Sequence, residues 1–360
     1  MKLQTRSGLY FGNFEKEIEG NPIRLFVLTN SNGVEACLTN FGARLVSLLI
    51  PDKKGVYDDV VLGHATLEEY INPEKQYYFG ATIGRYANRI ANGSFILNNE
   101  KYELPINDQK NHLHGGLHGF HNKAWRIFFV SSNEIEFSYL SKDLEEGYPG
   151  NVQVNVNYRL TDNNDLIISY KANTDKTTII NLTNHSYFNL QGEGNSTIND
   201  HRLIINADRF TLINKDTIPI GKVVSVKETP FNFLKLKPIG QDIDEKNEQL
   251  AIAKGYDHNF VLNDYLDGEE LLLAADVAEP VTGRCFKLYT NEPGIQFYSG
   301  NFLDGKTTGK NQTPHNYRSG FCLEPQHFPD SPNNPMFPSV ILKPNDHYFS
   351  KCIYSFGVSL

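Results

Sequence analysis

The sequence predicts an all-β protein built as a large antiparallel β-sandwich. In many short segments apolar residues recur at every second position, which is the pattern of a strand with one buried face. Gly, Pro and Asn separate these segments, and helical periodicity is scarce. The clearest run is the one in which Val152, Val154, Val156, Tyr158 and Leu160 alternate with polar residues.

The expected strands follow one another along most of the chain. A polar turn at 162–165 joins the run 152–160 to a second run at 166–170, which together form a hairpin. Asn98-Asn99 separates two shorter strands, because Asn tolerates the positive φ angles of a tight hairpin turn. Other strands are expected at 23–29, 44–50, 95–97, 101–104, 126–130, 134–140, 177–182, 203–212, 271–275, 285–290 and 295–299.

Helices make a small contribution to the expected fold. A turn or two is expected at 66–71, and the residues 242–254 have the composition of a short surface helix. We find no repeat, linker or low-complexity tract, and the Pro-rich stretch 325–338 is interpreted as an ordered loop. The whole chain, 1–360, is therefore expected to form one domain.

Charge and hydropathy argue against several classes of partner. Lys and Arg number 34 against 42 Asp and Glu, giving a net charge of −8 without basic blocks, so nucleic acid is not an expected partner. No run of 18 apolar residues exists, and we expect no membrane-spanning helix. The first 14 residues lack the apolar core of a secretory signal, which favours a cytoplasmic protein, although a mature chain whose signal had been cleaved would look the same.

The four cysteines are expected to be plain buried thiols. Cys37, Cys285, Cys322 and Cys352 are widely spaced and form no CxxC pair. This spacing disfavours a disulfide framework and a zinc knuckle.

Five polar clusters interrupt the strand pattern, and loops held by a rigid sheet are where functional groups gather. Four histidines lie in and just after the segment 111–116, namely His112, His114, His118 and His121. His112 and His114 form an HxH pair that would suit a metal, a structural hydrogen-bond role or proton transfer. His114 is the best candidate for proton transfer, because the glycines that follow it allow close approach. The clusters occupy 84–89, 111–116, 183–187, 255–259 and 321–326.

Single residues in the other clusters give weak signals. His185 follows an apolar strand, where a lone imidazole is more often structural. From local alternation, the Glu324 side chain could point either to water or into a concave face, and the solvated position is the more common one. The sequence around Asp257 is as typical of a turn as of a binding site. Arg89 is placed to reach hydroxyl oxygens over a sheet face.

Missing motifs narrow the chemistry. The sequence has no GxGxxG after a strand, no Walker loop, no GxSxG elbow and no HExxH pair. The available His, Glu, Asp, Arg, Asn and Gln, together with abundant Tyr and Phe, suit acid–base work on a neutral polyhydroxyl ligand.

Taken together, the segments resemble the aldose 1-epimerase (galactose mutarotase) family over nearly the whole chain. The order and spacing of the motifs carry the resemblance, and the sequence departs from the family's usual pattern at Tyr86, where a smaller aliphatic residue is commoner, and at the extra imidazole of His112. The matching segments are GRYANRIANGSF (84–95), NHLHGG (111–116), EEGYPGN (145–151), TNHSYFNL (183–190), GYDHNF (255–260), GIQFYSGNF (294–302) and CLEPQHFPDSPN (322–333).

The resemblance implies a β-supersandwich with an open cleft and a cofactor-free, metal-free interconversion of the α and β anomers of hexoses such as galactose and glucose. It implies that Glu324 is the general base, that His185 is the general acid, and that His114 assists at the ring oxygen. By the same matching, hydroxyl groups of the sugar would be held by Asn88, Arg89, Asp257 and Gln296. The expected partner is a small aldohexose, with the chain a monomer or a homodimer.

Other functions remain open on sequence alone. A hexose-6-phosphate epimerase of related fold would need more basic residues at the site than Arg85 and Lys123. A sugar-binding module without activity is disfavoured because both His185 and Glu324 are present. A glycoside hydrolase would use Asp257 and Glu324 as its carboxylate pair.

Overall fold

The computed structural model describes residues 3–73, 77–268 and 270–359, and most of its regular structure is antiparallel β-strand. The α-helices of this part of the chain are short, α1 at Leu67–Ile71 and α2 at Glu248–Ala253. Single turns of 3-10 helix lie at Phe11–Phe14, Ala91–Gly93, Phe120–Asn122, Glu145–Gly147, Ile198–Asp200 and Ser331–Asn333.

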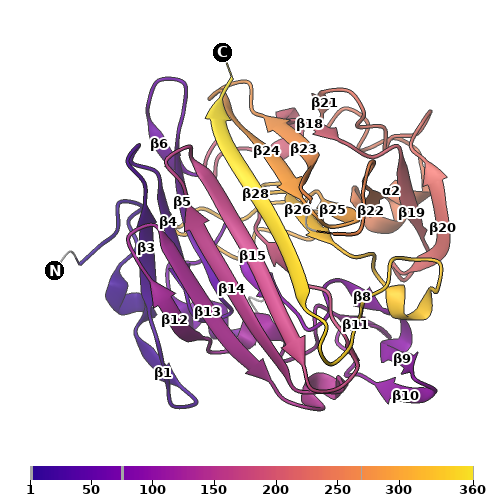
Figure 1. Ribbon diagram of the computed structural model, residues 1–360. Coiled ribbons are helices and arrows are strands. Elements are labelled where there is room, and N and C mark those ends of the chain that lie inside the picture. The colour runs from indigo at the N-terminus through magenta and orange to yellow at the C-terminus, as the bar shows by residue number, and fades with distance from the viewer. Residues whose placement is uncertain (1–2, 74–76, 269, 360) are drawn as a thin grey trace.

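A nine-stranded sheet forms the larger layer (Figure 1). The C-terminal strand β28 lies between β15 and β24, so the last strand of the chain is the central strand of this sheet. In order across the sheet the strands are β12 (Arg126–Val130), β13 (Glu134–Ser141), β14 (Val152–Leu160), β15 (Asp165–Thr174), β28 (Tyr348–Val358), β24 (Arg284–Thr290), β23 (Leu272–Ala278), β18 (Arg202–Ile205) and β21 (Lys237–Pro238).

Two smaller sheets and several strand pairs complete the sandwich. The five-stranded sheet has the order β20 (Pro219–Ser225), β19 (Arg209–Ile213), β22 (Asp257–Val261), β25 (Gly294–Tyr298) and β26 (Cys322–Gln326). The four-stranded sheet has the order β3 (Leu25–Thr29), β4 (Glu35–Thr39), β5 (Arg44–Pro51) and β6 (Tyr57–Asp59). The pairs are β1 (Lys16–Ile18) with β2 (Asn21–Ile23), β7 (Ala81–Ile83) with β17 (Thr183–His185), β8 (Arg89–Ile90) with β11 (His112–Leu113), β9 (Ser94–Leu97) with β10 (Glu100–Glu103), and β16 (Thr178–Ile179) with β27 (Ile341–Leu342).

The predicted fold class is confirmed, and so are the hairpins with the clearest sequence signals. Strands β14 and β15 pair with Leu160 opposite Leu166. The inward side chains of β14 are those of the alternating run, since buried and half-buried residues alternate over most of its length. Asn98 and Asn99 join β9 to β10 and have φ angles of 52° and 64°, as the tight turn requires.

Three elements differ from the prediction. The expected strand 203–212 is two strands in different sheets, β18 and β19, because the chain turns at Asn206, where the Ala207 amide donates to the Ile205 carbonyl at 2.8 Å. The expected helix 242–254 is shortened to α2, whose Asn247 cap accepts from the amides of Gln249 and Leu250. Strand β4 is buried on both faces, and the sequence analysis missed it.

Aromatic rings fill the space between the sheets. Phe188 is fully buried, and its ring centroid lies 5.1 Å from that of Phe286, 5.2 Å from that of Tyr354 and 6.1 Å from that of Phe321. Because β17 leads directly into this residue, the packing of Phe188 also fixes the strand that ends at His185. Within the described residues no helix is long and apolar enough to cross a membrane.

We predict that Phe188→Ala lowers the free energy of unfolding by about 3–5 kcal/mol, because removing a buried ring costs its transfer free energy and leaves a cavity. Urea denaturation measures this change. The control is Phe128→Ala on β12, since Phe128 is 72% exposed and its loss should change stability by less than about 0.5 kcal/mol. Equal losses in the two variants would contradict the assignment of Phe188 to the core.

Candidate active site

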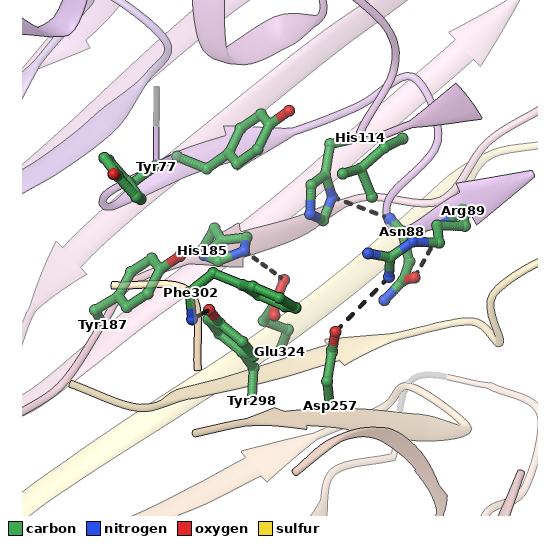
Figure 2. Close-up of a pocket in the computed structure, with 12 residues that line it drawn as sticks. Tyr77, Asn88, Arg89, His114, His185, Tyr187, Asp257, Tyr298, Phe302 and Glu324 are labelled. Atoms are coloured by element: carbon green, nitrogen blue, oxygen red, sulfur yellow. Dashed lines mark hydrogen bonds and ion pairs between the residues drawn. The ribbon is translucent and has the colours of Figure 1, made fainter. Parts of the chain in front are cut away.

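One pocket, of about 260 Å³, gathers most of the polar residues singled out in the sequence (Figure 2). Its walls come from segments far apart in the chain, and they combine acidic, basic and aromatic side chains. The lining residues are Tyr77, Tyr78, Asn88, Arg89, Leu113, His114, His185, Tyr187, Asp257, Tyr298, Phe302 and Glu324.

The register of the five-stranded sheet places two of these residues, Glu324 and Asp257, on the strands that flank β25. Glu324 on β26 lies opposite Gln296 on β25, and Asp257 on β22 lies opposite Tyr298 on β25. His185 arrives from outside this sheet, at the end of β17, opposite Ala81. All six strand positions are buried, so strand pairing rather than loop conformation fixes the two carboxyl groups and the imidazole.

His185 and Glu324 form the centre of the pocket. The His185 Nε2 atom lies 3.8 Å from Glu324 Oε2, and this oxygen is buried without a hydrogen-bond partner among the described residues. The imidazole ring stacks on Tyr187 and Tyr78 with centroid distances of 5.0 and 5.7 Å. Behind the ring, Cys322 Sγ lies 3.5 Å from Nδ1. A buried acceptor left open in this way is a place where a ligand hydroxyl would donate.

Burial shifts the proton equilibria of both members of this pair. It lowers the pKa of His185 to about 3, because the imidazolium would lose its water. Burial, with the Asp257 carboxylate as the second cause, raises the pKa of Glu324 well above its ordinary value. Both shifts favour the uncharged forms, a neutral imidazole and a protonated carboxyl group.

His114 has a fixed tautomer. The amide of Asn88 donates to its Nδ1 at 3.1 Å, and its own amide donates to the Asn88 carbonyl at 3.0 Å. Burial, and next the neighbouring His185, lower the pKa of His114 well below its ordinary value. Since Nδ1 accepts and the ring is neutral, Nε2 carries the hydrogen and acts as a donor. Gly115 is required beside it, because a Cβ there would overlap the Gly84 carbonyl.

An ion-pair chain holds the other end of the pocket. Arg89 Nη1 lies 3.8 Å from Asp257 Oδ2, and Arg89 Nε lies 2.7 Å from Asp108 Oδ2. The pKa of Arg89 is raised, since the attraction of Asp257 and Asp108 outweighs the effect of burial. Gln296 lies behind Asp257 and donates from Nε2 to its Oδ1 at 2.6 Å, so in this structure it supports a pocket residue instead of lining the pocket.

The sequence analysis missed the aromatic lining and Asp108. Tyr187 and Phe302 lie inside the quoted segments TNHSYFNL and GIQFYSGNF, so these motifs held a signal for them. Tyr77 and Tyr78 belong to no quoted motif, and neither does Asp108.

The other histidines of the 112–121 segment, His112, His118 and His121, do not line the pocket. His112 contacts the Pro105 carbonyl at 2.7 Å through Nδ1 and the Tyr148 hydroxyl at 2.6 Å through Nε2. Both nitrogen atoms of His112 are therefore occupied, which leaves it available neither as a metal ligand nor for proton transfer in the pocket. The structure does not gather this cluster around one point, whereas His185, Cys322 and Glu324 do bring a ligand atom each within 4.8 Å of one another.

Comparison with known proteins identifies the family of this chain. The aldose 1-epimerase family pattern matches residues 24–355. The chain belongs to the aldose 1-epimerase family. Galactose mutarotase of Bos taurus is 43% identical over 329 residues, covering 91% of this chain and 93% of that protein. Galactose mutarotase of Homo sapiens is 42% identical over 340 residues, covering 94% and 96%.

A solved structure from the same family agrees with the fold. An aldose epimerase homologue from C. elegans superimposes with a TM-score of 0.86 at 29% identity, covering 93% of this chain and 99% of that one. The resemblance found in the sequence is thus confirmed, and the pocket described above lies inside the part of the chain that aldose 1-epimerases share.

We predict that His114 stays in the neutral Nε2–H form when the folded protein is titrated from pH 8 to pH 5, because its pKa is held well below the ordinary value. Nitrogen-15 NMR of the histidine rings distinguishes the two tautomers and the imidazolium. In urea the same ring should titrate near about pH 6.5. An imidazolium at His114 in the folded protein at pH 5.5 would contradict the assigned hydrogen bond.

Proposed function

We propose that this protein is an aldose 1-epimerase that opens and recloses the pyranose ring of an aldohexose, such as galactose or glucose, by acid–base catalysis. The observation that carries the proposal is the buried pair of Glu324 and His185, 3.8 Å apart, at the centre of a pocket whose Glu324 Oε2 has no other hydrogen-bond partner among the described residues.

The reaction needs one proton taken and one proton given. A base removes the proton of the C1 hydroxyl while an acid protonates the ring oxygen, so the C1–O5 bond breaks and an aldehyde forms. Rotation about C1–C2 presents the other face of the carbonyl group, and the reverse transfers close the ring as the opposite anomer. General acid–base catalysis of this kind contributes about 10²–10⁴ in rate.

The pair is suited to this exchange because it holds a single proton. When the C1 hydroxyl donates to Glu324 Oε2, it stabilises the carboxylate form, and the proton moves to His185 without a change in net charge. Glu324 then acts as the base and His185 as the acid. Ring closure returns both protons, so the pair is ready for the next sugar in either direction.

The remaining polar residues have binding roles in this proposal. His114 donates from Nε2 toward the ring oxygen, where negative charge develops as the ring opens. Asn88, Arg89 and Asp257 hold hydroxyl groups of the sugar, and Gln296 keeps Asp257 in place. Aromatic rings such as Phe302 cover the apolar face of the sugar. Neither metal nor organic cofactor is required, because the charge at each oxygen is matched by a proton.

The competing functions fit the pocket less well. A phosphorylated sugar needs free cations, but Arg85 is committed to the Pro149 carbonyl at 2.7 Å and Lys123 to Glu145 at 3.3 Å. A glycoside hydrolase needs a second free carboxyl group, whereas Asp257 already accepts from Gln296 and faces Arg89.

Polarimetry of freshly dissolved α-D-galactose and α-D-glucose tests the proposal directly. Catalytic amounts of the protein should speed the approach to the equilibrium rotation well beyond the spontaneous rate. If both sugars equilibrate at the rate of the buffer alone, the proposed function is wrong.

We predict that Glu324→Gln lowers kcat at least about 10²-fold and leaves sugar affinity within a few fold, because the amide keeps the shape but cannot accept a proton. His185→Asn should also lower kcat, and the double variant should be little worse than either single one, since the two groups act as a unit.

The matched control is Glu292→Gln. Glu292 is also a buried glutamate paired with a histidine, with its Oε2 2.6 Å from His327 Nδ1, but it lies outside the pocket. The kcat of Glu292→Gln should equal that of the wild type. Multiplicative losses in the double variant would show that Glu324 and His185 act in separate steps.

We predict that Asp108→Asn raises KM about tenfold and changes kcat less, because Arg89 loses its closest ionic partner and moves toward Asp257. Initial rates at several sugar concentrations separate the two constants. Asp216→Asn is the control, since its partner Lys110 is 59% exposed and such surface pairs contribute little. A KM unchanged by Asp108→Asn would remove Asp108 from the sugar-binding network.

A further inference from the structure

A thiol lies directly behind the acid–base pair, and the proposed reaction does not use it. Cys322 precedes Glu324 by two residues on β26, so both side chains leave the strand on the same face. Its Sγ lies 3.5 Å from His185 Nδ1. Cys322 itself is fully buried and does not line the pocket, whereas His185 and Glu324 do.

We propose that His185, Cys322 and Glu324 form a three-ligand site for a thiol-seeking divalent cation such as Zn²⁺, and that the bound ion switches off the acid–base pair. The metal site stands on the geometry alone, and its inhibitory effect rests on the proposed function. An ion that enters through the pocket meets one nitrogen, one sulfur and one oxygen ligand.

The distances are close to those of a tetrahedral site. Zinc bonds of about 2.3 Å to sulfur and about 2.0–2.1 Å to nitrogen place the two ligand atoms about 3.5 Å apart, which is the observed separation of Cys322 Sγ and His185 Nδ1. One ligand atom from each of the three residues lies within 4.8 Å of the other two. The Glu324 carboxylate now faces Nε2, so it would move toward the sulfur by about 1 Å to complete the set.

The third ligand has no competing bond to break. Glu324 Oε2 is buried without a hydrogen-bond partner among the described residues, and a metal ion would satisfy it. As the metal binds, the Cys322 thiol releases its proton to solvent, because thiolate is the form that binds. The proton carried by Glu324 is released as well, because the ionised carboxylate is the ligand. Three protein ligands leave the fourth position open toward the pocket, for water or a sugar hydroxyl.

The ligand set selects among cations. Thiolate and imidazole favour Zn²⁺ and Cd²⁺, whereas Mg²⁺ and Ca²⁺ prefer six or more oxygen ligands. A bound ion would occupy the lone pair of Glu324 Oε2 that the proton transfer requires, and would stand close to the point where the C1 hydroxyl donates. Inhibition should therefore be competitive with sugar.

The first test follows the metal without any enzyme assay. Titration of the protein with Cd²⁺ should produce the ultraviolet thiolate-to-cadmium charge-transfer band, and Cys322→Ser should remove it. Cys285→Ser is the control, because Cys285 is the partly exposed cysteine on β24 and its loss should leave the band intact. A band that survives in both Cys322→Ser and Cys322→Ala overturns the site, and the alanine variant covers the case in which serine prevents folding.

The second test measures inhibition by Zn²⁺, with each variant's rate divided by its own rate in a chelator. The half-inhibiting concentration should rise at least about tenfold in Cys322→Ser and stay unchanged in Cys285→Ser, and Mg²⁺ should not inhibit the wild type. Zn²⁺ inhibition that is equal in all three proteins, or indifferent to sugar concentration, overturns the inhibitory role. If the wild type shows no epimerase activity, the proposed function fails and the cadmium band still decides the metal site.

Discussion

Burial of the Glu324 carboxyl group beside the His185 imidazole sets the demands that the rest of the site meets. Both side chains are nearly inaccessible to water, and an ionisable group without water is costly unless something holds it. The fold meets this cost by keeping the pair uncharged and by fixing it in rigid surroundings. Strand β26 is buried along its whole length, and the rings of Tyr78 and Tyr187 stack on His185. The two groups stay in place with no direct hydrogen bond between them.

A free cation beside this pair would favour the charged carboxylate of Glu324, and the pocket contains Arg89. Its positive charge is the one influence that lowers the pKa of Glu324, against the effects of burial and Asp257. Asp108 at 2.7 Å and Asp257 at 3.8 Å hold the guanidinium group away from the acid–base pair. The ion-pair chain thus does two things at once. It presents hydroxyl-binding groups at one end of the pocket, and it preserves the shared proton at the other.

Sequence reasoning succeeded where one physical pattern was strong and local. The alternation in β14 predicts the buried face of that strand, and Asn98-Asn99 predicts the turn between β9 and β10. It missed β4 and β26, in which both faces are buried and alternation disappears. It found β5 and β25, which are buried in the same way, from their apolar residues. Local sequence favoured a solvated Glu324, yet this residue is 2% exposed. Periodicity cannot reveal that residues as far apart as Arg89 and Glu324 share a pocket. Only the resemblance to aldose 1-epimerases brought them together before the structure was considered.

The properties that suit the pair to proton transfer also make it a ligand set. A general base needs an unpaired acceptor, and Glu324 Oε2 is one. A general acid that regains its proton needs a free nitrogen lone pair in its neutral form. The Cys322 sulfur lies close to His185 Nδ1 and within reach of the Glu324 carboxylate, so the open lone pair of Glu324 offers a thiol-seeking cation what it offers the sugar. Sugar and metal ion therefore compete for the same open acceptor, and the thiol decides which cations take part in that competition.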